Sequence, residues 1–294
     1  MLFLVALLVD GALAGAIYAL IALGFVVVYK ASRVINFALG EWLMLGALLV
    51  AVGAYRLALG LPGAVLAACV GMIGFAVLFN RLVLRRLVGR PVVSLIMVTL
   101  GLGALMRGGA ALLFRGIPGG VPLPLPQRVL EVGGLFVSID KLVAGIVAAA
   151  AVAAVTAAFR WTRTGVALRA IADDDRAALA AGIDVQRHLV IAWGTLGVLS
   201  VVAGTLWTSV ASGGLGLVLV GLKVFPVVVI GGLDSIPATI LAALLIGLLE
   251  TLTAGYVDPI VGTGFSTIAP FVLVILVLFT RPYGLLGSPD VRRV

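Results

Sequence analysis

The sequence has little of the chemistry on which enzymes and disulfide-bonded domains depend. Its 294 residues include one cysteine, Cys69, and one histidine, His188. A single cysteine excludes an internal disulfide, and Cys69 lies inside an apolar run, so we expect it to act as a small hydrophobic side chain. A single histidine removes most metal-binding and acid–base chemistry. We expect His188 to lie at a membrane interface.

Charge is scarce as well. Only 11% of the residues are charged, 63% are hydrophobic, and the mean hydropathy is +1.30. An average soluble domain contains about 25% charged residues, so this chain has more apolar residues than a soluble core can bury. Long apolar runs such as residues 11–29 exclude a membrane β-barrel, which is built from short alternating strands. The composition predicts an all-α, polytopic helical membrane protein.

Motifs for nucleotide binding and hydrolysis are missing from the sequence. There is no G-x-x-x-x-G-K-[ST] motif, so the chain does not bind ATP through a P-loop. The acidic triplet 173–175 is the type of sequence that binds magnesium in membrane prenyl transferases, but a second acidic cluster is missing. An intramembrane enzyme is therefore the least favoured class, and we expect this chain to bind neither a metal nor a cofactor.

The apolar runs predict about nine membrane crossings, within a range of eight to ten. Each crossing needs about 20 residues to span a hydrocarbon core of about 30 Å. The predicted spans are 2–29, 36–55, 61–80, 91–114, 139–159, 189–211, 217–233, 236–254 and 265–280. The first run has features of a signal peptide, but it contains Asp10, lacks a preceding basic residue and continues to Tyr29. These features favour a retained span.

The basic residues predict the orientation of the chain. The net charge of +8 arises from residues in short loops, which indicates membrane topology rather than nucleic-acid binding. If the N-terminus is outside, fourteen of the twenty basic residues lie inside: Lys30, Arg33, Arg81, Arg85, Arg86, Arg90, Arg160, Arg163, Arg169, Arg176, Arg187, Arg281, Arg292 and Arg293. We therefore expect an outside N-terminus and a cytoplasmic C-terminus.

One long polar segment, residues 163–188, interrupts the apolar sequence. Val166, Ile171, Leu179 and Ile183 recur in it at helical spacing, with charged residues between them. This pattern predicts one or two amphipathic helices outside the bilayer, each with an apolar stripe and a charged face. We expect the segment to lie in the cytoplasm and to contact a soluble partner.

The longest outer segment, residues 114–139, is rich in proline and glycine, which rules out a continuous helix. Its composition is typical of an ordered external cap or a short hairpin. A plain connecting loop is the alternative.

Ionisable side chains within the spans are candidates for a substrate pathway, because a charge in the bilayer is costly unless it is paired or faces water. Glu41 is expected near the inner end of the second span, with Asn36 shortly before it. Arg107, Lys223 and Glu250 are each expected within about 10 Å of the outer surface. We hypothesise that Glu250 pairs with Arg107 or Lys223 and lines an outward-facing path. Alternatively, the two basic side chains extend to the interface.

Two stretches of the sequence predict broken helices. The residues expected at the breaks are Gly40, Gly231, Gly232, Asp234 and Pro237. Unwound backbone at membrane depth is tolerated only where it is buried in protein or lines a cavity. Helix ends exposed in this way bind the charged termini of small solutes. Gly231 and Gly232 can equally form a tight inner turn.

Four stretches resemble one protein family, in the order in which that family has them. Residues 18–47, 164–187, 229–250 and 281–287 resemble LivH-type permeases, the membrane subunits of bacterial ABC importers for branched-chain amino acids. The resemblance implies one importer permease domain over residues 1–294. It also implies a cytoplasmic coupling segment at 160–188, an external loop at 115–138, and a location in the bacterial cytoplasmic (inner) membrane.

The resemblance further implies a division of labour between subunits. A second permease of the LivM type would form the pathway with this chain, and two cytoplasmic ATPase subunits would use ATP and magnesium. A periplasmic or lipid-anchored binding protein would deliver the amino acid. The chain would not be an enzyme by itself, and no nucleic acid would take part. Transport would proceed by alternating access, driven by ATPase subunits docked on residues 164–187.

The coupling residues follow from the same resemblance. Ala177, Ala178 and Gly182 fit the A-A-x-x-x-G part of the loop signature of ABC importers. Arg176 stands where that signature usually has glutamate, and the later Ile-x-Leu-Pro end is absent. The residues assigned to ATPase coupling are Arg169, Asp173, Asp174, Arg176, Ala178 and Gly182.

The substrate class implied is branched-chain or related small apolar amino acids. Urea or a short amide, carried by a permease of the same family, is an alternative substrate. A stand-alone carrier or channel is an alternative class, although such a protein has no need of the polar segment at 164–187.

Overall fold

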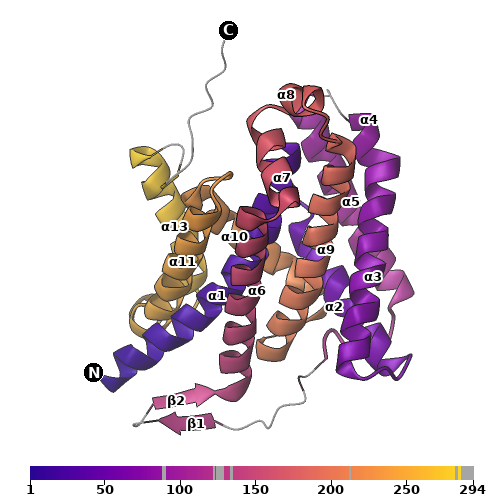
Figure 1. Ribbon diagram of the computed structural model, residues 1–294. Coiled ribbons are helices and arrows are strands. Elements are labelled where there is room, and N and C mark those ends of the chain that lie inside the picture. The colour runs from indigo at the N-terminus through magenta and orange to yellow at the C-terminus, as the bar shows by residue number, and fades with distance from the viewer. Residues whose placement is uncertain are drawn as a thin grey trace. The chain divides into compact units, whose positions relative to one another are not determined.

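The computed structural model describes residues 1–87, 91–121, 123, 129–132, 135–211, 213–281 and 284–285. Its elements are shown in Figure 1. In chain order they are α1 (Leu2–Ser32), α2 (Leu39–Tyr55), α3 (Leu61–Phe79), the π-helical turn η1 (Asn80–Leu84), α4 (Arg85–Leu87), α5 (Val92–Leu113), β1 (Val129–Val132), β2 (Leu135–Ser138), α6 (Ile139–Trp161), α7 (Arg163–Asp173), α8 (Asp175–Ala180), α9 (Val185–Val210), the short 3-10 turn η2 (Gly214–Gly216), α10 (Leu217–Gly231), α11 (Ile236–Tyr256), α12 (Asp258–Val261) and α13 (Phe265–Thr280).

The helices confirm the prediction of a polytopic helical membrane protein. Among the described residues, seven helical segments are long and apolar enough to cross a membrane by length and composition. The helices α2 and α13 are shorter apolar helices. Together these segments coincide, within a few residues, with the nine predicted spans. The largest difference is at α9, which begins at Val185 because the Asp184 side chain accepts a hydrogen bond from Arg187 N at 3.0 Å and caps the helix.

The segment 114–139 ends in the hairpin that was one of its two expected forms. Strands β1 and β2 are antiparallel, with Val129 opposite Ser138 and Leu130 opposite Val137. The strands lead directly into α6, which begins at Ile139.

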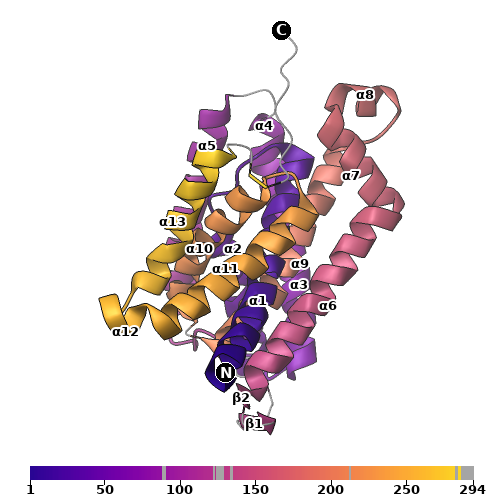
Figure 2. The same cartoon turned by 90° about the vertical axis from the view of Figure 1, so that its left-hand side faces the viewer.

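The chain forms two compact units. Unit 1 comprises Met1–Val26, Leu125–Val152 and Lys223–Val294, and unit 2 comprises Val27–Pro124 and Ala153–Leu222. In unit 1, α11 packs against α13, and Figure 2 shows these two helices side by side in orange and yellow. The helix α11 also packs closely on α1, where a Cβ atom at Gly247 would lie 2.6 Å from Gly15 N. Glycine is needed at this contact, because any side chain would separate the two helices.

Unit 2 is built around α2, α3 and α9, which pack on one another. An aromatic cluster fills the space between them. The ring centroids of Trp42 and Trp193 are 5.6 Å apart, and those of Phe79 and Trp193 are 4.9 Å apart. Trp42 and Trp193 are both fully buried. Helix α5 packs against α2 in the same unit and places its polar residues beside the start of α2.

Candidate functional site

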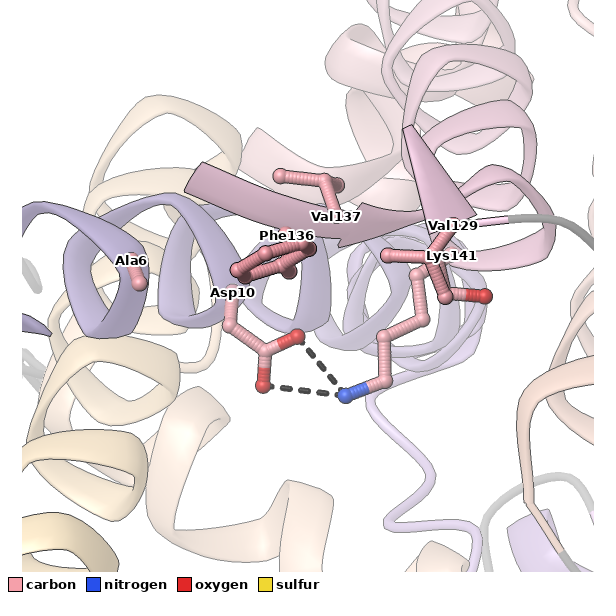
Figure 3. Close-up of a pocket in the computed structure, with 7 residues that line it drawn as sticks. Ala6, Asp10, Val129, Phe136, Val137 and Lys141 are labelled. Atoms are coloured by element: carbon pink, nitrogen blue, oxygen red, sulfur yellow. Dashed lines mark hydrogen bonds and ion pairs between the residues drawn. The ribbon is translucent and has the colours of Figure 1, made fainter. Parts of the chain in front are cut away.

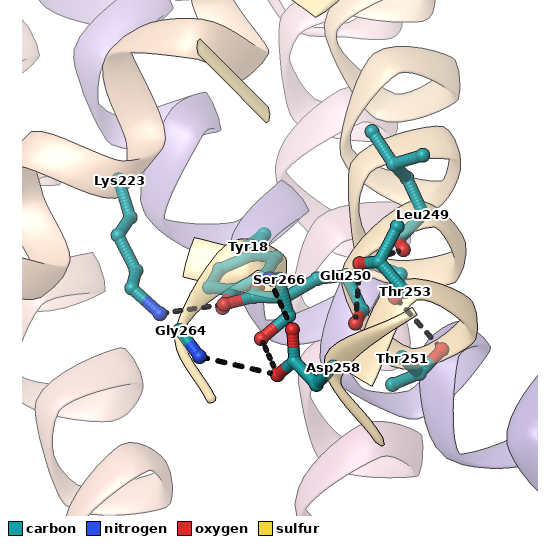
Figure 4. Close-up of polar contacts among 10 residues, drawn as sticks. Tyr18, Lys223, Leu249, Glu250, Thr251, Thr253, Asp258, Gly264 and Ser266 are labelled. Carbon is teal, nitrogen blue, oxygen red and sulfur yellow. Dashed lines mark hydrogen bonds and ion pairs between the residues drawn. The ribbon is translucent and has the colours of Figure 1, made fainter. Parts of the chain in front are cut away.

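A charged cluster in unit 1 joins three helices (Figure 4). Lys223 on α10 places its Nζ 2.5 Å from Glu250 Oε1 on α11, and the Tyr18 hydroxyl on α1 donates to Glu250 Oε2 at 2.5 Å. Both carboxylate oxygens therefore have a partner. The Lys223 and Glu250 side chains are 29% and 18% exposed, and Tyr18 is buried. Of the two partners that the sequence proposed for Glu250, the structure pairs it with Lys223.

A second charged pair lies in unit 2 and accounts for Arg107. Arg107 Nε on α5 is 3.1 Å from Glu41 Oε1 in the first turn of α2. The Arg107 side chain is 52% exposed, whereas the Glu41 side chain is only 5% exposed. The sequence hypothesis that offered Arg107 as a partner of Glu250 is therefore corrected. The hypothesis relied only on the expected depth of each residue in the membrane. Depth does not indicate which helices are neighbours.

Glu41 lies in the first turn of α2 and faces α5 partway along its length. A Cβ atom at Gly103 would lie 3.0 Å from the Glu41 carboxyl group, and Gly103 is about 16 Å from the start of α5. Glu41 therefore lies well along α5 rather than near its first residue. Helix α2 thus begins beside the middle of α5, and the chain reaches it through the non-helical residues 33–38.

Side chains satisfy the backbone of this non-helical stretch. Phe37 N donates to Thr99 Oγ1 at 3.4 Å, and Ala38 N donates to Asn36 Oδ1 at 3.1 Å. Asn36 and Thr99 are both buried. Unwound backbone at membrane depth persists only where protein groups replace water in this way. The predicted break near Gly40 is therefore present, but it ends at Ala38 and precedes Gly40.

Gly40 itself belongs to the first turn of α2 and serves close packing. A Cβ atom there would lie 2.8 Å from Val218 Cα, and Gly221 faces the same point from the other side. The expected role of Gly40 as the broken residue is thus corrected. The missing side chain allows α2 and the beginning of α10 to approach each other at backbone distance.

The second expected break, at residues 231–237, is a tight turn between two helices. Gly231 is the last residue of α10, and Gly232 has a positive φ of 93°, which glycine adopts without steric cost. Helix α11 begins at Ile236 with Pro237 in its first turn, where the missing proline N–H needs no partner. Asp234 lies in the turn. Gly232 therefore lies in a turn that directly follows Gly231 and joins two separate helices, α10 and α11.

The polar segment forms two helices, α7 and α8, as its pattern predicted. The α7 helix is held against the end of α6, because the Arg169 guanidinium donates to the Phe159 carbonyl and Gly165 leaves room for that contact. The Arg33 side chain donates to Ala172 O at 2.7 Å and fixes the last turn of α7. Arg169 therefore anchors the segment to the end of α6.

The other residues assigned to coupling lie between the last residue of α7 and the turn that follows α8. Asp173 and Asp174 are exposed, and Asp174 Oδ1 accepts a hydrogen bond from Ala177 N at 3.0 Å, which caps α8. Ala178 is buried, and Gly182 is exposed with a positive φ of 82° in the turn before α9. The side chain of Arg176 lies outside the described part of the chain.

The apolar residues at helical spacing in this segment are buried only in part. Ile171 is 6% exposed, but Val166 is 53% and Leu179 is 58% exposed. Leu168, which the pattern did not single out, is buried in their place. Two apolar side chains thus face outward from a segment that lies outside the spans.

A third ion pair was missed by the sequence reasoning. Lys141 Nζ on α6 lies 2.7 and 3.0 Å from the two carboxylate oxygens of Asp10 on α1, and Figure 3 shows the side chains pointing toward each other. The residues that line the adjoining cavity of about 300 Å³ are Ala6, Asp10, Val129, Phe136, Val137, Ser138 and Lys141. The sequence signal for this pair was Asp10, an acidic residue within an apolar run. The Tyr18 hydroxyl, which belongs to the Glu250 cluster, was a second polar group in the same run.

The loop between α11 and α13 is fixed by one carboxylate, also drawn in Figure 4. Asp258 Oδ2 accepts from the Ser266 hydroxyl at 2.7 Å, and Asp258 Oδ1 accepts from Ser266 N at 2.9 Å. These hydrogen bonds, led by that of the Ser266 side chain, lower the pKa of Asp258 below its ordinary value. Within the described ranges, no group of three or more His, Cys, Asp and Glu residues is arranged to hold a metal ion.

Comparison with known proteins identifies similar chains. The family described as "Branched-chain amino acid transport system / permease component" matches residues 7–280. The high-affinity branched-chain amino acid transport system permease protein LivH of Escherichia coli (strain K12) is 29% identical, covering 97% of this chain and 96% of LivH. The corresponding permease protein BraD of Pseudomonas aeruginosa is 29% identical, covering 98% of this chain and 97% of BraD. Among solved structures, PsaBC from Streptococcus pneumoniae in complex with Fab aligns with a TM-score of 0.45 and 17% identity, covering 92% of this chain and 90% of that chain.

Proposed function

We propose, because this chain belongs to the family of branched-chain amino acid transport system permease components, that it is the membrane-spanning permease subunit of an ATP-driven importer for branched-chain amino acids. The observation that carries the proposal is the family match over residues 7–280. Two relatives of nearly equal length, LivH and BraD, are named for the same transport. These names favour branched-chain amino acids over urea or short amides.

In this proposal the chain is one permease domain and a non-catalytic subunit. It has no P-loop, so partner ATPase subunits would bind and hydrolyse ATP with magnesium. A second permease of the LivM type would complete the pathway, and a periplasmic or lipid-anchored binding protein would supply the amino acid. The distribution of the basic residues supports an N-terminus outside the bacterial inner membrane and a C-terminus in the cytoplasm.

The ATPase docking surface in this proposal is the segment formed by α7 and α8. Two features support it. Val166 and Leu179 expose apolar side chains outside the spans, which is typical of a surface that a partner covers. Arg169 and Arg33 tie α7 to the ends of α6 and α1, so a force on the segment is transmitted to two membrane helices.

The transport mechanism in this proposal is alternating access. ATP binding closes the ATPase subunits, which then bind one conformation of the permease more tightly than the other. The chain supplies two places where helices can reorient, the non-helical residues 33–38 and the turn at 232–235. The charged pairs Glu41–Arg107 and Lys223–Glu250 are the candidate polar groups along the pathway.

Co-purification tests the proposal. The tagged chain is extracted from its native membranes in mild detergent, and its partners are identified by mass spectrometry. We expect P-loop ATPases and a second permease with the parent chain. We expect Leu179→Asp to lose the ATPases, whereas Leu57→Asp, which alters an exposed apolar residue (61% exposed) between α2 and α3, keeps them. A parent chain that is isolated alone even after crosslinking would exclude the importer and favour a stand-alone carrier or channel.

A further inference from the structure

We propose that the guanidinium of Arg107 is a carboxylate-binding site on α5. The identity of its ligand, the carboxylate of a transported amino acid, rests on the proposed import function. The site is distinct from the Lys223–Glu250 cluster. In that cluster both oxygens of Glu250 are already occupied, by Tyr18 and by Lys223.

The contact with Glu41 uses only one edge of the Arg107 guanidinium. Glu41 Oε1 lies 3.1 Å from Nε, and no further hydrogen bond of Arg107 is found within the described ranges. The two terminal nitrogens therefore remain available as a fork of parallel donors. A carboxylate fits such a fork with two hydrogen bonds, and a charge-assisted pair of this kind is about twice as strong as a neutral one.

Glu41 acts as the positioning residue for this fork. The Glu41 side chain is almost completely buried, so water does not compete with Arg107 for its carboxylate. Gly103 makes the space that the carboxyl group occupies, because a Cβ atom there would lie 3.0 Å from Glu41 Oε1. Arg107 is thereby fixed on the α5 surface before a ligand arrives, which lowers the entropic cost of binding.

The α5 surface beside Arg107 is exposed and carries small residues. Gly108, the residue after Arg107, has no atom within 4 Å of the place where its Cβ would lie. Ala104, one turn before Arg107 on the same face of the helix, is exposed. This face leaves room for a small solute beside the guanidinium.

A cation at this place is unfavourable against lipid. Arg107 lies within a span and about 9 Å before its last residue, and its side chain is 52% exposed. A charge in hydrocarbon is unfavourable, so the exposed part of the side chain needs water or an anion. Arginine suits this role better than lysine, because only a guanidinium offers a bidentate fork while a third nitrogen stays paired.

Thiol labelling of the full chain in native membranes tests the site. In a Cys69→Ser background, Ala104→Cys places a single thiol one turn from Arg107. The matched control is Leu105→Cys, because Leu105 is 75% exposed on another side of α5. We expect a membrane-impermeant methanethiosulfonate to modify Ala104→Cys about tenfold faster, since the reacting thiolate forms in water.

Protection by small ligands then identifies the chemistry. Leucine and 3-methylbutanoate, which both carry a carboxylate, are expected to slow labelling of Ala104→Cys about threefold at twice their dissociation constant. The amine 3-methylbutylamine, which has no carboxylate, is expected to leave the rate unchanged. Arg107→Gln is expected to abolish the protection, and Arg107→Lys, which keeps the charge without the fork, to abolish most of it.

Several results overturn the proposal. Equal labelling of Ala104→Cys and Leu105→Cys would mean that this face meets lipid. Protection by the amine, or protection that persists in both Arg107 variants, would exclude a carboxylate site at Arg107. Leucine uptake by the Cys69→Ser membranes is measured in parallel. Its absence would contradict the import function, while protection by 3-methylbutanoate would still report on the site.

Discussion

Tyr18 and Glu250 are separated by 232 positions in the chain, yet the Tyr18 hydroxyl lies 2.5 Å from Glu250 Oε2. The contact links the first long helix, α1, to α11 within unit 1. Lys223 occupies the other carboxylate oxygen, so a charge inside the helical layer is balanced by one cation and one hydroxyl. A group satisfied on both sides is expected to hold the helices together.

Removal of the Glu250 charge is therefore expected to destabilise unit 1. Glu250→Gln leaves Lys223 without its counter-charge, at a cost of about 1–3 kcal/mol for a pair that is partly exposed. We expect a lower melting temperature in detergent and a smaller loss in the double variant Glu250→Leu with Lys223→Met, which removes both charges. Unchanged melting and unchanged uptake in Glu250→Gln would contradict this role.

The hydroxyl of Tyr18 is expected to contribute separately. Tyr18→Phe keeps the buried ring and removes only the donor to Glu250, at a cost of about 1.5–3 kcal/mol for a hydrogen bond to a charged group. The melting temperature in detergent should fall, whereas in a Glu250→Leu background the same substitution should have little effect. An equal loss in both backgrounds would show that the ring, rather than the hydroxyl, is responsible.

Gly247 is expected to tolerate no side chain. In Gly247→Ala the new methyl group would lie 2.7 Å from Gly15 Cα, so α1 and α11 must separate. Gly74→Ala is the matched control, because no atom lies within 4 Å of its Cβ position, and alanine raises helix propensity by about 1 kcal/mol. Thermal melting should show a loss for Gly247→Ala and no loss for Gly74→Ala. The opposite order would refute the close packing of α11 on α1.

Asp258 is expected to give a pH-dependent contribution to stability. Its pKa in the folded chain is lowered by the hydrogen bonds from Ser266, so the carboxylate stabilises the fold above the unfolded pKa of about 3.9. This contribution is lost as the pH falls through the pKa of Asp258 in the folded chain, which is lower than its pKa in the unfolded chain. Asp258→Asn and Ser266→Ala should each melt below the parent at pH 7 and approach it in acid. A melting difference that does not depend on pH would contradict the assignment.

Arg169 is expected to be needed for the position of α7. Arg169→Gln removes the donor to the Phe159 carbonyl and frees α7 from the end of α6. Limited proteolysis should then cleave the segment 163–188 faster, whereas Arg163→Gln, at an exposed position, should leave the rate unchanged. Equal cleavage of the two variants would show that Arg169 does not anchor the segment.

The amino-acid sequence was sufficient to predict the fold class and the approximate span boundaries. The nine apolar runs are local signals that the surrounding structure does not override. The resemblance of residues 18–47 and 164–187 to LivH-type permeases also agreed with the family that the comparison identified.

The pairing of charged residues was predictable only in part. Lys223 and Glu250 were both recognised as costly charges, but the choice between Lys223 and Arg107 depends on which helices are neighbours. The non-helical residues 33–38 place Glu41 beside the middle of α5, and hydrophobic periodicity alone does not indicate this position. The Asp10–Lys141 pair was not predicted, because nothing local in the sequence connects α1 with the start of α6.

Leucine uptake tests the central claim most directly. Membrane vesicles are prepared from cells with and without an intact gene for this chain, and accumulation of labelled leucine is measured with and without ATP at the cytoplasmic face. The account predicts ATP-dependent accumulation that requires the chain and is lost with Leu179→Asp. Accumulation that is equal in both vesicle types, or that proceeds without ATP when the chain is present, would contradict the importer and point to another transport class.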